Sequence, residues 1–188
     1  MSGFTLWLTG LSGAGKSTIS QLVTAELEAR GLIVDLLDGD VVRTRLSHGL
    51  GFTRADRDTN IERIGWVASR LARAGATVVV AAISPYGDAR RRARAMTEEF
   101  APFVEVWVST PLDICIGRDP KGLYARAHAG RLTGMTGIDD PYEQPMVPEI
   151  TVDTSERPPE ESVRQVLEAL EQRGLVPPAA ADSPPPAS

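Results

Sequence analysis

A phosphate-binding loop is the strongest chemical signal in the sequence. Residues 10–17 read GLSGAGKS and match the pattern G-x-x-x-x-G-K-[ST] in full. The glycines let backbone N–H groups turn inward around phosphate oxygens, and the N-terminus of a following helix adds partial positive charge. Lys16 can then reach the β- and γ-phosphates of ATP or GTP, and the Ser17 hydroxyl can ligate Mg²⁺. The residues predicted to bind this nucleotide are Gly10, Leu11, Ser12, Gly13, Ala14, Gly15, Lys16, Ser17 and Thr18.

An acidic pair follows the next predicted strand. Asp38 and Asp40 lie on either side of Gly39. Carboxylates beside a phosphate loop suit a small-molecule kinase, in which Asp40 can order magnesium-bound water or accept the proton of an acceptor hydroxyl. A turn or a helix N-cap is the structural alternative, and both roles stay open for Asp38. The guanine-reading motif N-K-x-D cannot occur, because the only asparagine, Asn60, is followed by isoleucine.

Residues suited to an anionic nucleotide come next along the chain. Arg43 and Arg57 can each hold an anion with a guanidinium fork. Phe52 can stack on a base, and the amide of Asn60 can read a base edge. Each residue alone is compatible with an ordinary surface or core role. Together, and close to Asp40, they indicate an anionic nucleotide as the second substrate.

The composition narrows the class of protein. The chain has 188 residues, of which 42% are hydrophobic and 24% charged, as expected of one globular domain. A net charge of −5 disfavours binding to a long nucleic acid. The apolar runs are too short for a membrane span, no secretory signal is recognisable, and the single cysteine, Cys115, cannot form an intrachain disulfide. We therefore expect a cytoplasmic protein that binds neither membrane nor nucleic acid.

Alternating strands and helices must position these residues. Short apolar runs predict strands over residues 4–9, 32–37, 77–83, 103–108 and 149–152. Apolar residues at helical spacing predict helices over residues 16–30, 56–74, 87–99, 112–117 and 159–173. This alternation predicts an α/β fold, a five-stranded and mostly parallel sheet with helices on both faces. Ligands in such folds bind at the carboxyl ends of the strands.

Two segments fall outside this alternation. Residues 118–148 are rich in glycine and proline without a clear period, which is typical of a functional loop. Residues 177–188 are rich in proline and alanine and are expected to be a disordered tail after a single domain over 1–176. The basic run 90–94 is expected to form a solvated helix face. Only Lys16 and Lys121 of the 20 basic residues are lysine, which suggests that a compact ammonium is needed at both positions.

Six segments together resemble the adenylylsulfate kinase family, which phosphorylates the 3′-hydroxyl of adenosine 5′-phosphosulfate with ATP. They are GLSGAGKST (10–18), LDGDVVR (37–43), LGFTRADRDTNIERIG (50–65), ISPY (83–86), RDPKGLY (118–124) and TGIDDPYE (136–143). The segments occur in the family's order between residue 6 and about residue 150, and the last two are long and distinctive. The resemblance implies a P-loop kinase of the nucleotide-kinase type, a role in sulfate activation, and a homodimer as an open option.

The resemblance also implies roles for individual residues. Arg118 lies near the adenine of ATP, and residues 121–145 form a lid within the segment 118–148. Lys16, Asp40 and Lys121 act in catalysis, with Mg²⁺ held by Ser17 and Asp40 directly or through water. Ser84 corresponds to a serine described in the family as a phosphoenzyme intermediate, although direct transfer between two bound nucleotides needs no covalent carrier. The residues implied to bind the acceptor are Asp38, Asp40, Arg43, Phe52, Arg57, Asn60, Ile83, Ser84, Lys121, Gly122, Leu123 and Met135.

Four positions depart from the family pattern. Val41 replaces an asparagine, Ala82 a phenylalanine and Gly87 an arginine. Met135 replaces the lid phenylalanine that faces Phe52 across the acceptor's adenine. These departures leave two alternatives open, a paralogous kinase with another nucleotide-like acceptor and a non-catalytic nucleotide-binding regulator. The intact catalytic residues argue against the second.

Overall fold

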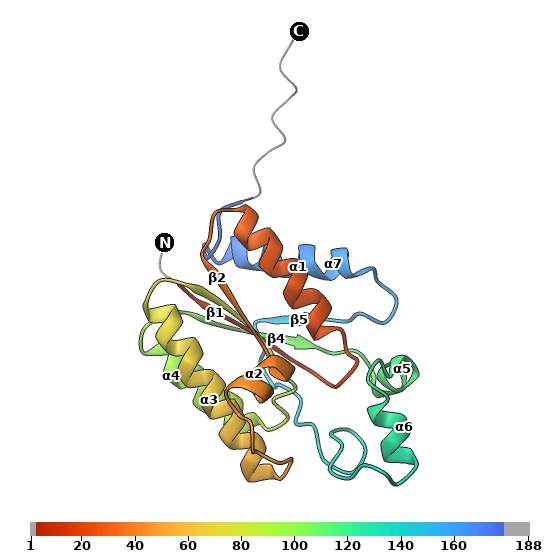
Figure 1. The fold of residues 1–188 in the computed structure, drawn as a ribbon. Coiled ribbons are helices and arrows are strands. Elements are labelled where there is room, and N and C mark those ends of the chain that lie inside the picture. The colour runs from red at the N-terminus through yellow and green to blue at the C-terminus, as the bar shows by residue number, and fades with distance from the viewer. Residues whose placement is uncertain (1–2, 179–188) are drawn as a thin grey trace.

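A five-stranded parallel sheet forms the centre of the computed structural model, which describes residues 3–178 (Figure 1). Its strands are β1 (Thr5–Thr9), β2 (Val34–Asp38), β3 (Thr77–Ala81), β4 (Phe103–Val108) and β5 (Ile150–Val152). They lie in the order β2-β3-β1-β4-β5, and every pairing is parallel. β1 and β3 are buried at every residue, which explains their continuous apolar sequence.

Helices cover both faces of the sheet, as Figure 1 shows. α1 (Lys16–Ala29) and α7 (Pro159–Gln172) pack on one face, and α3 (Arg54–Arg73) and α4 (Gly87–Glu98) pack on the other. Alternate residues of β1 serve the two sides, because Leu6 and Leu8 join the core under α1 while Trp7 joins the core under α3. Three short helices, α2 (Gly39–Arg45), α5 (Leu112–Arg118) and α6 (Leu123–His128), surround the carboxyl ends of the strands.

The predicted fold class is confirmed, with small corrections. Each predicted strand and helix is present, and its ends differ from the prediction by at most two residues. Two short helices were not predicted. α2 begins directly after Asp38, and α6 lies inside the segment 118–148, which is therefore not wholly irregular. The basic run 90–94 was also misjudged, since Arg90 is buried.

The remaining expectations can be compared with the structure only over residues 3–178. No helix within residues 3–178 is long and apolar enough to cross a membrane. The expected disordered tail begins at residue 177, and its residues 179–188 lie outside the described residues. Residues 1 and 2 of the predicted domain also lie outside the description.

Candidate functional site

The phosphate-binding loop joins β1 to α1 and closes around the side chain of Lys16. The Lys16 ammonium donates hydrogen bonds to the carbonyl oxygens of Gly10, at 2.9 Å, and Leu11, at 2.7 Å. Gly13 and Gly15 have φ angles of +76° and +101°, a region that residues with a side chain rarely adopt. The loop is therefore shaped to present a single ammonium at the N-terminus of α1.

Three hydroxyl groups outside the loop hold its backbone in place. The hydroxyls of Thr110 and Thr154 both donate to the carbonyl oxygen of Ala14, at 3.0 and 2.9 Å. The buried hydroxyl of Tyr124 donates to the carbonyl oxygen of Ser12 at 2.9 Å. Tyr124 belongs to the RDPKGLY segment, but neither threonine was predicted from the sequence. The threonines follow different strands, and only the folded sheet brings them to the same carbonyl.

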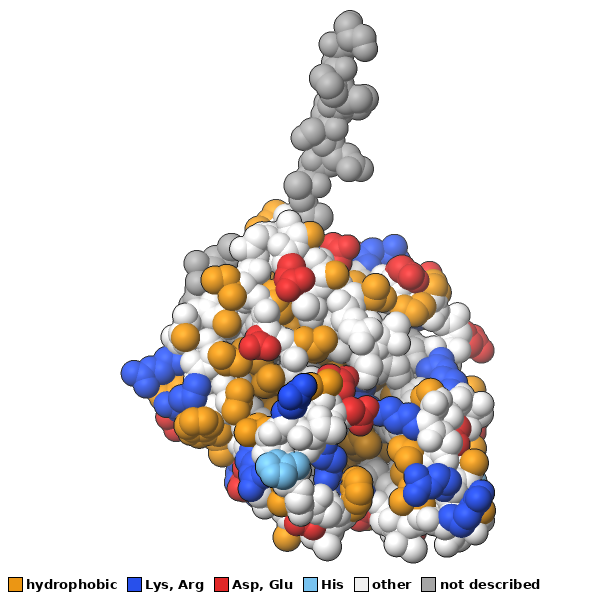
Figure 2. All heavy atoms as spheres, viewed as in Figure 1, with side chains coloured by type: hydrophobic (Ala, Val, Ile, Leu, Met, Phe, Trp, Pro, Cys, Tyr) orange, Lys and Arg blue, Asp and Glu red, His pale blue; other side chains and the backbone are white. Residues whose placement is uncertain are grey.

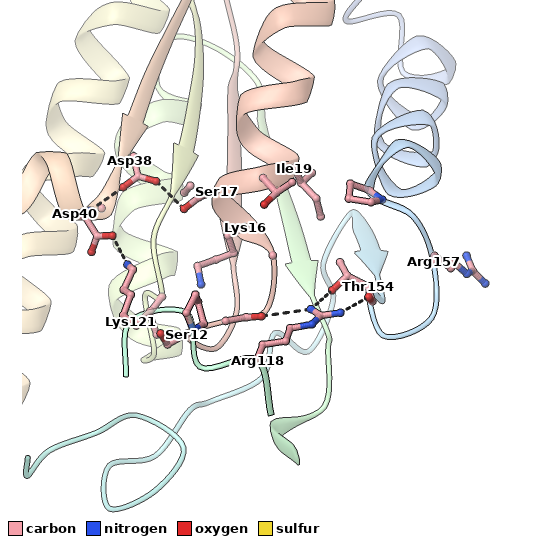
Figure 3. Close-up of a pocket in the computed structure, with 18 residues that line it drawn as sticks. Ser12, Lys16, Ser17, Ile19, Asp38, Asp40, Arg118, Lys121, Thr154 and Arg157 are labelled. Atoms are coloured by element: carbon pink, nitrogen blue, oxygen red, sulfur yellow. Dashed lines mark hydrogen bonds and ion pairs between the residues drawn. The ribbon is translucent and has the colours of Figure 1, made fainter. Parts of the chain in front are cut away.

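A cavity of about 540 Å³ opens over the phosphate loop (Figure 3). Arg118 lies on its wall and donates to the hydroxyl of Thr154 at 2.8 Å and to the carbonyl of Thr154 at 2.5 Å. The wall of the cavity thus connects through Thr154 to the carbonyl of Ala14 in the loop. The lining includes Ser12, Gly13, Gly15, Lys16, Ser17, Thr18, Asp38, Gly39, Asp40, Ile83, Arg118, Lys121, Thr154 and Arg157.

The acidic pair stands at the edge of this cavity, with each carboxylate in a different role. Asp38 caps α2 by accepting from the backbone N–H of Asp40 at 3.0 Å, and it accepts from the Ser17 hydroxyl at 2.9 Å. Asp40 forms an ion pair with Lys121, which reaches across from the RDPKGLY segment (Figure 3). Both side chains of this ion pair are about half exposed or more. Figure 2 shows acidic and basic side chains beside each other at a hollow in the middle of this face.

The oxygen atoms around Ser17 fit a magnesium ion that arrives with a nucleotide. Mg²⁺ in kinase sites takes one or two carboxylates, substrate phosphates and several waters. The Ser17 hydroxyl and the Asp38 carboxylate, 2.9 Å apart, supply such hard oxygen ligands. Within residues 3–178, no group of three or more His, Cys, Asp or Glu side chains could hold a metal by itself. The donors beside Ser17 therefore need the phosphates to complete a metal site.

A second cavity of about 300 Å³ adjoins the first. Five residues line both cavities, namely Ser12, Gly39, Asp40, Ile83 and Lys121. Of the predicted acceptor residues, the second cavity also brings together Arg43, Phe52, Arg57, Asn60, Ser84, Leu123 and Met135. Asp38 lines the first cavity, and Gly122 is not among the described residues that line either one. The two cavities therefore meet at the ion pair of Asp40 and Lys121.

Two arginines shape the second cavity around Phe52. The buried guanidinium of Arg57 donates to the carbonyl of Phe52 at 3.0 Å, to the hydroxyl of Thr136 at 2.9 Å and to the carbonyl of Gly134. Arg43 lies 4.4 Å from the centroid of the Phe52 ring. The Phe52 side chain is nonetheless 59% exposed, so the aromatic ring still offers surface to a ligand.

Two further acceptor residues line this cavity with little exposure. Asn60 is buried, and its side-chain oxygen has no hydrogen-bond partner among the described residues. A buried acceptor without a partner is costly unless a ligand or water donates to it. Met135 is 5% exposed and packs into the core under α1. The departure from the family's phenylalanine therefore lies in the cavity wall itself.

The hydroxyl of Ser84 is already committed to hydrogen bonds within the wall of the second cavity. It accepts from the indole N–H of Trp7 at 3.1 Å and donates to the carbonyl of Ala82 at 3.3 Å. Ser84 is buried and has a φ of +41°, an uncommon backbone conformation for a residue with a side chain. This arrangement suits a wall residue better than a nucleophile.

The charge on Lys16 predicts a pH dependence of nucleotide binding. Burial, together with the smaller effect of the nearby ammonium of Lys121, lowers the pKa of Lys16 to about 8. Phosphate binds the protonated form, so the affinity for ADP is expected to fall as the pH rises through 8, by up to about tenfold per pH unit. Calorimetric titration of ADP between about pH 7 and about pH 9.5 measures this effect.

A Lys16→Met variant serves as the control for this titration. It lacks the titrating group, so its weaker affinity for ADP is expected to stay nearly constant over the same range. An equal pH dependence in both proteins would assign the effect to another group.

Comparisons with known proteins agree with this geometry. A family model described as adenylylsulphate kinase matches residues 2–153. An adenylyl-sulfate kinase of Myxococcus xanthus is 54% identical over 181 residues, which cover 96% of this chain and 97% of that protein. A probable bifunctional SAT/APS kinase of Sorangium cellulosum is 54% identical over 177 residues, and this chain spans 30% of its length. A structure of the Mycobacterium tuberculosis APS kinase with AMPPNP and APS has a TM-score of 0.87 and 44% identity, covering 90% of this chain and 98% of that one.

Proposed function

The chain belongs to the adenylylsulfate kinase family, and from this premise we infer that its two adjoining cavities hold the two substrates of one phosphoryl transfer. The protein is a kinase that uses ATP to phosphorylate the 3′-hydroxyl of adenosine 5′-phosphosulfate. A non-catalytic regulator is thereby set aside. The proposal rests on one observation, that the same five residues line both cavities.

We assign ATP to the cavity over the phosphate loop. The loop amides and Lys16 hold its phosphates, and Arg118 lies where the adenine extends along the wall. The oxygens of Ser17 and Asp38 would hold a magnesium ion that arrives with ATP, and Asp40 would help to hold it through water. When bound with ATP, this ion supplies neutralisation of the phosphate charge.

We assign adenylylsulfate to the second cavity. Arg43 and Arg57 supply positive charge for the phosphosulfate group, and the exposed face of Phe52 stacks on the adenine. The side-chain oxygen of Asn60, which has no hydrogen-bond partner within residues 3–178, accepts a hydrogen bond from the ligand. Met135 closes the same cavity with a flexible thioether in place of an aromatic ring.

The transfer itself takes place where the cavities meet. The 3′-hydroxyl oxygen forms a bond to the γ-phosphorus, the bond from that phosphorus to the bridging oxygen of ADP breaks, and Asp40 accepts the hydroxyl proton. Lys121 exchanges its partner Asp40 for the transferred phosphoryl group, whose negative charge it stabilises. Because both substrates are bound in line, the reaction requires no phosphoenzyme.

Two expectations about the protein's surroundings remain proposals. We place the protein in the cytoplasm, since Cys115 is buried and free and its substrate ATP is an intracellular nucleotide. We also propose that a second copy of the chain is a partner in a homodimer, in addition to the small-molecule partners ATP and adenylylsulfate. Neither expectation enters the mechanism.

The assignment of the cavities is tested by an Arg43→Gln variant. Arg43 lines only the second cavity, so its loss is expected to raise the KM for adenylylsulfate by roughly 10- to 100-fold, the range for a hydrogen bond to a charged group. The KM for ATP is expected to change by less than about twofold. Arg45→Gln is the matched control, because Arg45 lies exposed on the same helix. A rise in both KM values for Arg43→Gln would contradict the separation of the two sites.

A Ser84→Ala variant is expected to retain at least about a third of the wild-type turnover, since only two weak wall hydrogen bonds are lost. The measurement is kcat with both substrates saturating, together with mass spectrometry of the wild-type protein after incubation with ATP. Complete loss of turnover, with a phosphoryl group found on Ser84, would establish the covalent route instead.

A further inference from the structure

Arg90 of α4 is a buried cation whose guanidinium joins three separate segments. Its Nε donates to the carboxylate of Glu105 at 2.8 Å. One Nη donates to the carbonyl of Ser84 at 2.6 Å, and the other donates to the carbonyl of Glu143 at 2.7 Å. Its side chain is 5% exposed, and it is not among the described residues that line either cavity. Arg90 therefore acts on a ligand only through the residues that it holds.

The bond from Arg90 to the carbonyl of Ser84 supports one wall of the acceptor cavity. Ile83, Ser84 and Pro85 all line that cavity. Ser84 holds a φ of +41°, a conformation that persists only where the surroundings enforce it. Trp7 bonds its side chain, and Arg90 bonds its backbone carbonyl. The strained turn is thus held from both sides.

The bond from Arg90 to the carbonyl of Glu143 supports a second wall of the cavity. Gly134, Met135 and Thr136 line the cavity, and Glu143 follows them at the end of the TGIDDPYE motif. The backbone N–H of Glu143 donates to the carbonyl of Pro85 at 2.8 Å. Arg90 adds the bond to the carbonyl of Glu143, so the two walls converge on its guanidinium.

We propose that Arg90 is a positioning residue for the acceptor, which sets the spacing of the two walls that enclose it. This inference rests on the proposed function, because it takes the second cavity as the adenylylsulfate site. An ion pair with Glu105 alone does not explain the arginine, since a buried pair can be replaced by apolar residues without loss of stability. The two carbonyl bonds need a planar fork with several N–H donors, which a lysine ammonium cannot reproduce.

Two substitutions at Arg90 separate positioning from charge pairing. Arg90→Lys keeps a cation opposite Glu105 but loses the fork. The double variant R90M/E105L removes both buried charges together. Both are expected to raise the KM for adenylylsulfate about tenfold, the effect of a lost hydrogen bond from a charged group, and to change the KM for ATP less than about twofold. Glu105→Gln keeps both carbonyl bonds and is expected to keep the wild-type KM for adenylylsulfate, while the loss of the carboxylate charge beside the buried Arg90 lowers the stability of the fold.

Arg91→Met is the matched control, because Arg91 is the next residue on the same helix and is 70% exposed. Thermal unfolding of each variant checks that the protein is folded. The double variant decides the question if Arg90→Lys does not fold, since it leaves no unpaired buried charge. Restoration of the wild-type KM for adenylylsulfate in the double variant, or an equal rise in both KM values, would overturn the proposal. An inactive wild type would instead overturn the proposed function, so the two failures are distinguishable.

Discussion

A Lys16→Ala variant is expected to fold and to lose turnover by a factor of about 100 to 1,000, as when an enzyme loses one preorganised donor to a developing charge. The ammonium of Lys16 is held at the centre of the phosphate loop by the carbonyls of Gly10 and Leu11. The γ-phosphoryl group carries its charge past this point in the proposed transfer. A neutral side chain leaves that charge unopposed in a desolvated pocket.

The measurement for Lys16 is kcat in a coupled assay, with circular dichroism as a check of folding. Lys16→Arg is expected to be nearly as inactive, because the loop encloses one compact ammonium and not a planar fork. Gln21→Ala is the control, since Gln21 is exposed on the same helix. Near-normal turnover of Lys16→Ala would remove the phosphate loop from the reaction.

An Asp40→Asn variant is expected to lower kcat by a factor of about 100 or more, the usual contribution of a general base. Asparagine has the same shape but cannot accept the proton of the 3′-hydroxyl, and it loses the ion pair with Lys121. The KM for ATP is expected to change by no more than about threefold, because Asp38 remains beside Ser17.

Asp35→Asn provides the comparison for Asp40, since Asp35 is exposed on the strand that leads into the acidic pair. That variant is expected to retain the wild-type kcat. If Asp40→Asn also retains the wild-type kcat, other residues must accept the proton of the 3′-hydroxyl and hold Lys121 in place.

The phosphate loop and the sheet could be predicted from the sequence because both depend on local patterns. The glycines and Lys16 of the loop follow a fixed spacing, and the strands are continuous apolar runs. α2 and α6, with seven and six residues, show too little of a helical period to be predicted, whereas the equally short α5 was predicted from its apolar run LDICI. The open question about Asp38 is answered only by the fold, in which its side chain both caps α2 and accepts a hydrogen bond from Ser17.

The supports of the site depend on contacts between distant segments. Thr110 and Thr154 are unremarkable in the sequence, and their common target becomes visible only when β4 and β5 lie side by side. The spacing of the basic run 90–94 could have indicated that some of its arginines face the core, although the run as a whole is strongly charged. Arg90 and Arg94 are four residues apart on one face with the buried Ala93 beside them, and they pair with Glu105 and Glu149.

The central claim is that ATP and adenylylsulfate meet at Asp40 and Lys121, so that the γ-phosphoryl group passes to the 3′-hydroxyl. The most direct test incubates the wild-type protein with both nucleotides and magnesium, and locates the transferred group by phosphorus NMR. The account predicts equal amounts of ADP and of adenylylsulfate phosphorylated at the 3′-position. Formation of ADP with unmodified adenylylsulfate, or a phosphoryl group at any other position, would contradict it.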